Sequence, residues 1–240
     1  MKREEYGQEN EKVIVMLHGA NFVHSFQKQY VLAANYHIIV PHLMGFGNDT
    51  ERIFNTEKCV GELAEYIRTL DKKVMLVGFS LGAQLAYKLV SEHEHLFCSA
   101  VLISPWLIKE EPMFSKVMKM NQKQFRSFKK KWFCNFVGRM NGLLTSEREE
   151  FVTQMQNMKY ETIQRSVDNG ITLESVSGFD SISIPVIALA GAKEQNEVKD
   201  SVKKLAEANP NCNYEIWEKA GHNIPAVFPE KLNSVICSLM

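Results

Sequence analysis

The chain has 240 residues, 45% of them hydrophobic, and a formal net charge of zero at pH 7 from 28 basic and 28 acidic residues. This length suits one α/β domain with a sizeable core, or one domain with an insertion. The balanced charge gives no sign of a nucleic-acid-binding protein, and no apolar run approaches the roughly 20 residues that span a bilayer. The N-terminal segment MKREEYGQENEK lacks the apolar region of a signal peptide, so we expect a cytoplasmic protein.

Short apolar runs recur along the chain, with amphipathic segments between them. The runs cover 13–17, 37–40, 74–77, 100–103 and 186–190, and a more alternating run covers 213–217. Runs that are apolar on both faces predict buried parallel strands. Helical periodicity marks 56–70, 81–90, 198–208 and 225–239. The alternation predicts an α/β fold, in which helices cover both faces of a mostly parallel central sheet.

The segment 105–178 interrupts this alternation. Apolar residues from Phe114 to Met140 recur at spacings of three, four and seven, which predicts an amphipathic helix that is broken once. A further helix is expected over 160–167. We therefore predict an α/β core made of 1–104 and 179–240, with 105–178 as an inserted, all-helical cap over the sheet.

A serine lies between two glycines where a predicted strand meets a predicted helix, in Gly78-Phe79-Ser80-Leu81-Gly82. This context is typical of a nucleophile elbow, which holds a serine Oγ above the C-terminal end of a strand. The helix N-terminus beneath it favours developing negative charge. A plain tight turn would use similar residues, whereas a nucleotide loop is disfavoured because G-x-x-x-x-G-K-[ST] is absent.

A serine needs a base to act as a nucleophile at neutral pH. His222 follows the last predicted strand, at the same edge of the sheet as Ser80. In the chain order Ser, acid, His, the acid follows the 186–190 strand. Glu194 is the first candidate, and Glu197 and Asp200 are alternatives. The other histidines lack the spacing of a metal site, so no metal and no cofactor are expected.

Two backbone N–H groups are candidates for stabilising an oxyanion, those of Leu81 and Ala20, with Asn21 as an alternative to Ala20. His18, in MLHGAN, is expected to hold this loop rather than to transfer protons. The Met- and Phe-rich positions of the insertion are typical of core packing, and also suit a malleable apolar acyl pocket. The candidate pocket residues are Asn21, Phe79, Trp106, Phe125 and Phe128.

Five segments together resemble the α/β-hydrolase superfamily, and they occur in family order: VIVMLHGA, PHLMGFG, VMLVGFSLGAQLA, ISIPVIALAGAKE and AGHNIP. The resemblance implies an eight-stranded core, a triad of Ser80, Glu194 and His222, and a helical cap after the sixth strand. Two departures stand out. Only about twelve residues precede the first strong strand, so the first antiparallel strands are expected to be truncated. Glu194 also stands where the family usually has an aspartate.

These features predict a serine hydrolase that cleaves a carboxylic ester or thioester through an acyl-enzyme. Amidase, C–C hydrolase and perhydrolase chemistry use the same groups. A hydrolase-fold ligand receptor or signalling protein with slow turnover is an alternative from another class. The basic residues of 116–139, with no acid between Glu111 and Glu147, predict either a solvated helix face or a docking surface for an acidic partner.

Overall fold

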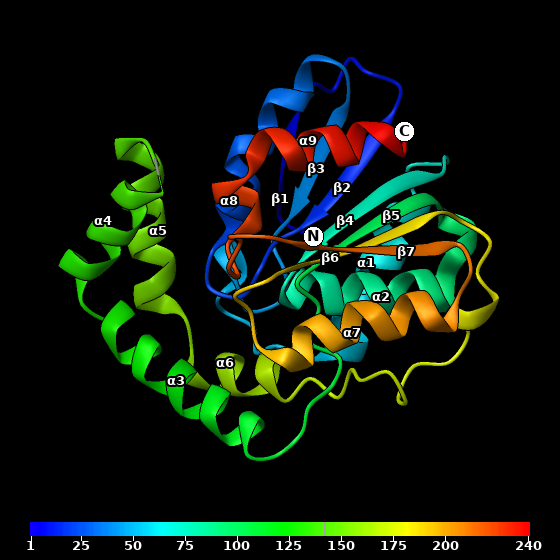
Figure 1. The fold of residues 1–240 in the computed structure, drawn as a ribbon. Coiled ribbons are helices and arrows are strands. Elements are labelled where there is room, and N and C mark those ends of the chain that lie inside the picture. Colours follow the sequence, from blue (N-terminus) through cyan, green and yellow to red (C-terminus); the bar gives the residue numbers. More distant parts are fainter. Residues whose placement is uncertain (142) are drawn as a thin grey trace.

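The computed structural model describes residues 1–141 and 143–240, and a twisted, mostly parallel sheet runs through its centre (Figure 1). Seven strands in this part of the chain follow the order β1-β3-β2-β4-β5-β6-β7, and β1 alone runs antiparallel, against β3. The strands are β1 (Arg3–Tyr6), β2 (Val13–Leu17), β3 (His37–Pro41), β4 (Val74–Phe79), β5 (Phe97–Ile103), β6 (Val186–Gly191) and β7 (Cys212–Trp217).

Helices cover both faces of the sheet because the central strands are apolar on both sides. On one face lie α1 (Thr56–Arg68), α2 (Leu81–His93) and α7 (Asn196–Ala208). On the other lie α8 (Ile224–Val227), α9 (Pro229–Ser238) and the 3-10 segment η1 (Val23–Ala34). Alternate residues of each strand enter two separate apolar clusters, so that Val15 packs toward α1 and α2, and Met16 packs toward η1 and α9.

In the described residues four helices lie between β5 and β6, and the first three extend away from the sheet while the fourth lies near α7 (Figure 1). They are α3 (Met113–Phe128), α4 (Lys131–Met140), α5 (Thr145–Asn157) and α6 (Tyr160–Val167). We call them the helical insertion. The break between α3 and α4 and the bounds of α6 confirm the periodicity seen in the sequence. Three short 3-10 turns, η2 (Gly47–Asp49), η3 (Glu94–Leu96) and η4 (Phe179–Ser181), complete the regular structure of the described residues.

The predicted α/β class and the mostly parallel sheet are confirmed. A single antiparallel strand occupies the edge where the resemblance implies a hairpin, so the sheet of the described residues has seven strands rather than eight. The sequence pattern missed β1, because its residues are REEY and carry no apolar run. Across 1–141 and 143–240, no helix is both long enough and apolar enough to cross a membrane.

Candidate active site

Ser80 occupies a strained turn between β4 and α2. Its φ is 54° and its ψ is −115°, which few residues other than glycine adopt. The flanking glycines allow this turn, because their neighbours are too close for a side chain. A Cβ on Gly82 would lie 2.0 Å from the carbonyl oxygen of Leu17, and one on Gly78 would lie 2.4 Å from that of Gly82. The turn therefore holds the Ser80 hydroxyl clear of both strand and helix.

A chain of hydrogen bonds links Ser80 to two residues that are distant in sequence. His222 Nε2 lies 3.0 Å from Ser80 Oγ, and His222 Nδ1 lies 2.6 Å from Glu194 Oε2. Nδ1 donates to the carboxylate, so Nε2 is left to accept the serine proton. The three side chains predicted to act together are thus brought together, in the order that general-base activation of a serine requires.

The Glu194 carboxylate is enclosed, with a side chain only 3% exposed. Burial by itself raises the pKa of this carboxyl. The hydrogen bond and charge of His222, together with donors from Gly191 and Ser104, outweigh that effect and lower the pKa below its ordinary value. Glu194 therefore stays ionised at neutral pH and can orient the imidazole ring and stabilise its charged form.

Ser104 is a site residue that the sequence interpretation missed. Its Oγ donates to Glu194 Oε1 at 2.7 Å, and the Gly191 N–H donates to the same oxygen at 2.8 Å. Ser104 follows β5 directly, is fully buried and has a φ of 54°. A serine immediately after a buried strand, at the sheet edge that carries Ser80 and Glu194, was the available signal.

The loops that carry the acid and the histidine are joined by backbone hydrogen bonds. Lys193 N donates to Ala220 O at 2.9 Å, and Ala192 N donates to Trp217 O at 3.0 Å. The Phe79 ring also lies 5.1 Å from the His222 ring, centre to centre. These contacts fix the separation of Glu194 and His222 without a contribution from the helical insertion.

His18 holds the loop that follows β2. Its Nδ1 donates to Gly19 O at 2.7 Å, and its Nε2 accepts from Leu43 N at 3.1 Å. Burial lowers the pKa of this ring to about 3, so it stays neutral. Both ring nitrogens are occupied, which agrees with the expected positioning role. The same loop carries Ala20, and Asn21 with a φ of 69°.

A cavity of about 410 Å³ opens beside Ser80, between the sheet edge and α3. Asn21, Phe79 and Trp106 line it as predicted, and so do Ala20 and Leu81 with Ser80, Glu194 and His222. The lining that the sequence interpretation missed comes from α2, α3, α6 and the start of α7. It consists of Gln84, Val117, Met120, Asn121, Gln124, Ser166, Val167, Lys193, Gln195 and Val198, with Gly19.

Two predicted pocket residues lie elsewhere. Phe128 is buried between Phe133 and Phe151, with ring centres 5.3 and 5.9 Å away, so it belongs to the interior of the helical insertion. Phe125 packs on Tyr160 with ring centres 5.2 Å apart. The α3 face toward the cavity is instead the one that carries Val117, Met120, Asn121 and Gln124. Periodicity predicted the helix, but it did not predict which face of the helix lies toward the cavity.

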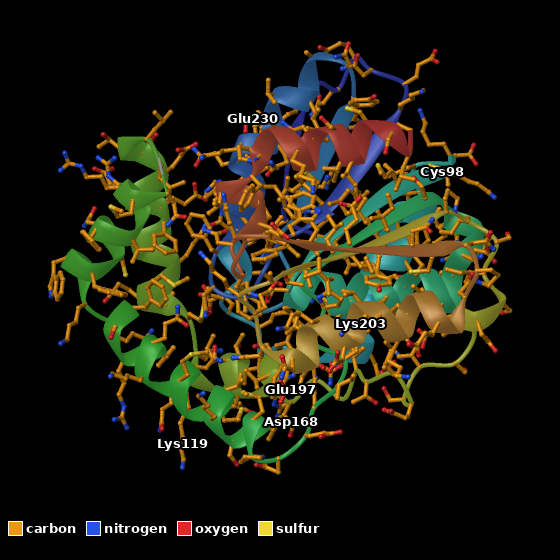
Figure 2. All side chains as sticks on the ribbon, in the orientation of Figure 1. Cys98, Lys119, Asp168, Glu197, Lys203 and Glu230 are labelled. Carbon is orange, nitrogen blue, oxygen red and sulfur yellow. The ribbon has the colours of Figure 1, made fainter. Side chains whose placement is uncertain are left out.

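The two alternative acids do not approach the imidazole. Asp200 pairs with Lys203 on the surface of α7 at 2.8 Å, and Glu197 lies on the same helix (Figure 2). Glu194 is therefore the carboxylate that contacts His222. Within 1–141 and 143–240, no group of three His, Cys, Asp or Glu side chains is placed to hold a metal ion.

Comparisons with known proteins agree on the fold. Residues 12–229 match the family model described as alpha/beta hydrolase fold. No curated protein matches the chain. Many solved structures do, and three similar ones are an esterase from Exiguobacterium antarcticum, a thermophilic esterase from Thermogutta terrifontis and MenH from S. aureus.

These structural matches extend over nearly the whole chain at low sequence identity. The Exiguobacterium esterase is 20% identical with a TM-score of 0.73, and the match covers 98% of this chain and 93% of the esterase. The Thermogutta esterase is 16% identical with a TM-score of 0.71, covering 99% and 91%. MenH is 19% identical with a TM-score of 0.71, covering 99% and 96%. At such identities the likeness concerns the fold alone.

Proposed function

Since the chain belongs to the alpha/beta hydrolase fold family, we propose that it is a serine hydrolase that cleaves carboxylic esters or thioesters. The observation that carries the proposal is the continuous hydrogen-bonded chain from Ser80 through His222 to the buried Glu194. Ser80 attacks the carbonyl carbon while His222 accepts its proton. His222 then returns the proton to the leaving alcohol or thiol, and an acyl-enzyme remains.

The oxyanion of each tetrahedral intermediate needs donors beside Ser80. Leu81 is the first residue of α2, and its N–H has no intrahelical acceptor. Ala20 lines the same cavity from the loop that His18 holds. We assign the oxyanion hole to these two backbone N–H groups. The N-terminus of α2 adds a favourable dipole at the same place.

Deacylation requires water, and the site is open to it. The His222 side chain is 55% exposed, although both of its ring nitrogens are hydrogen-bonded. Water can therefore reach the ring, lose a proton to Nε2 and attack the acyl-enzyme.

The cavity favours a short or polar acyl group. Its volume of about 410 Å³ is near the lower end of the usual range for ligand sites. Amide side chains from the core and from α3 line it together with Lys193. A long alkyl chain would cover those of their polar atoms that have no partner within the protein, which is unfavourable. The amide-bearing lining residues are Asn21, Gln84, Asn121, Gln124 and Gln195. We propose that 105–178 is the cap that sets this selectivity through α3.

Burst kinetics with p-nitrophenyl acetate test the mechanism. We expect a rapid release of p-nitrophenol equal to the enzyme concentration, then a slower steady state. Ser80→Ala should abolish the burst and lower turnover by about 10⁴-fold or more. A fluorophosphonate probe should label the wild type and not the variant. Full turnover in Ser80→Ala would refute the mechanism, and strong labelling without turnover on any ester would favour the receptor alternative.

A further inference from the structure

We propose that the outward face of α4, with the basic face of the neighbouring α3, is a docking surface for an anionic lipid membrane. The juxtaposition behind this inference is an exposed apolar row that is flanked by cations. The proposal concerns binding, not hydrolysis, and it stands independently of the proposed function.

The solvent-facing side of α4 carries large apolar residues in one row. Trp132, Phe136 and Met140 follow each other at intervals of four and are 67%, 56% and 72% exposed. The opposite side of α4, with Cys134 and Gly138, is buried toward the rest of the insertion. Isolated exposed apolar residues are ordinary on a protein surface, but three on successive turns of one helix form a contiguous strip that favours an apolar phase.

Cations border this strip. Lys130, Lys131 and Arg139 are exposed on or beside α4. On α3, Lys116, Lys119, Lys123 and Arg126 are exposed at spacings of three and four, and Lys119 projects away from the sheet (Figure 2). The sequence has no acid between Glu111 and Glu147. Such a surface is attracted to anionic lipid headgroups while its apolar row enters the interface.

Lys129 does not belong to this surface, although the sequence groups it with the others. Its ammonium donates to the carbonyl oxygens of Met155, Gln156 and Met158 at 2.6 to 2.9 Å. It therefore satisfies the C-terminal end of α5. This assignment separates one structural lysine from the cations that remain available to a partner.

The lysines at the N-terminus of α4 interact unfavourably with the dipole of that helix. Five other helices of the chain, α1, α5, α6, α7 and α9, have an acid in the first turn, which suits the helix dipole. The helices α2, α3, α4 and α8 have none, and α4 differs from the other three because it begins with Lys130 and Lys131. Positive charge at a helix N-terminus is unfavourable for the helix, so these two lysines do not stabilise α4 and are available to an anionic partner.

Charge and shape decide between possible occupants. A second copy meeting this face through a two-fold axis would oppose cations with cations, which disfavours a homodimer here. The helix that carries the apolar row, α4, lies at the outer margin of the molecule (Figure 1). A ridge of this kind can enter a deformable lipid interface without requiring a shaped complement.

Tryptophan fluorescence offers a direct test, because the three tryptophans differ in exposure. Trp106 and Trp217 are 9% and 3% exposed, against 67% for Trp132. Vesicles of phosphatidylcholine with about 30% phosphatidylserine should shift the emission to the blue and co-sediment with the protein. Vesicles of phosphatidylcholine alone should do neither. Trp132→Phe should lose the shift but still co-sediment.

Matched variants separate the surface from general charge and hydrophobicity. Lys130→Gln/Lys131→Gln/Arg139→Gln should weaken binding by roughly 100-fold, since each basic residue near an anionic surface contributes about fivefold. Lys73→Gln/Lys203→Gln/Lys204→Gln removes the same charge elsewhere and should have little effect. Trp132→Ser/Phe136→Ser should abolish binding. Its control, Val31→Ser/Val227→Ser, changes two residues that are 68% and 62% exposed on the core and should bind normally.

Three results would overturn the proposal. The first is an unchanged emission and no sedimentation with the anionic vesicles. The second is a dimer in analytical ultracentrifugation that Phe136→Ser dissociates, which would assign the face to a second copy. The third is a blue shift with poly-L-glutamate but not with the vesicles, which would assign it to an acidic protein. Binding that depends on both the apolar row and the three cations supports it.

Discussion

The sheet edge and the helical insertion are stabilised in different ways. All six residues of β4 are buried, and three hydrogen bonds hold the Glu194 carboxylate after β6. In contrast, α3 buries only Val117 and Phe128. The reactive groups are thus fixed by the core, whereas the cavity wall on α3 depends on a helix with few anchors. Changes at the sheet edge should alter the chemical step, and changes on α3 should alter substrate choice.

Apart from the loss of Ser80 itself, the largest expected effect comes from the acid. Glu194→Gln keeps the size of the side chain but removes the charge that orients and stabilises the imidazolium of His222. We expect kcat to fall by about 10³–10⁴-fold with little change in KM. Steady-state kinetics on p-nitrophenyl acetate measure both. Glu197→Gln and Asp200→Asn are the matched controls and should stay near wild type. A similar loss in either control would contradict the assignment of the acid.

The close packing of the elbow predicts a large loss of stability. In Gly82→Ala the new methyl group meets the Leu17 carbonyl oxygen, so the strand and the helix must separate. We expect the free energy of unfolding to fall by about 3 kcal/mol or more. Gly61→Ala, in α1, meets no atom within 4 Å and should instead stabilise the protein by roughly 0.5–1 kcal/mol. Urea denaturation of the two variants measures the contrast.

The hydrogen bonds of Glu4, on the edge strand β1, predict how the stability of the protein depends on pH. The Glu4 side chain is 21% exposed, accepts from Tyr6 Oη at 2.6 Å and lies 3.5 Å from His42 Nε2. Burial raises the pKa of Glu4, but the His42 and Tyr6 contacts and the charges of His24 and His42 outweigh it and lower this pKa from 4.5 to about 2.

A depressed pKa stabilises the fold above the unfolded value, and this contribution is lost as the pH falls from about 4.5 toward 2. Glu4→Gln should therefore cost roughly 1–3 kcal/mol at pH 7 and flatten the acid limb of the stability curve. Thermal unfolding between pH 2 and 7 measures this. Glu9→Gln is the control, and an acid limb equally steep in Glu4→Gln and the wild type would contradict the expectation.

The sequence predicted the core better than the insertion for a physical reason. A buried parallel strand is apolar on both faces, and the strand ends place Ser80, Glu194 and His222 at one edge of the sheet. Their meeting follows from topology without knowledge of any rotamer. Ser104 was missed because a single buried serine carries no periodic signal. Strand β1 was missed because an edge strand with charged residues has no apolar run.

Hydrophobic periodicity could not predict which residues of α3 line the cavity. An amphipathic pattern shows which residues of α3 avoid water, but not which neighbour they meet. Phe125 and Phe128 meet other helices of the insertion, while Met120 lines the cavity although it is 54% exposed. Cavity-lining residues such as Met120, Asn121 and Gln124 are partly exposed and polar or flexible, so hydrophobic periodicity excludes them from any list of core positions.

The smallest expected effect tests the role of that wall. Met120→Ala shortens a side chain at the mouth of the cavity and leaves Ser80 and its partners untouched. We expect kcat/KM for p-nitrophenyl hexanoate to rise by about threefold to tenfold relative to the acetate, since a methylene group in a pocket is worth roughly 1 kcal/mol or more. The acetate itself should react at the wild-type rate.

Lys119→Ala, on the outward face of α3, is the control and should leave the chain-length preference unchanged. If Met120→Ala instead lowered kcat for both esters equally, α3 would be supporting the reactive groups, and the division between a core that performs the chemistry and an insertion that selects the substrate would fail.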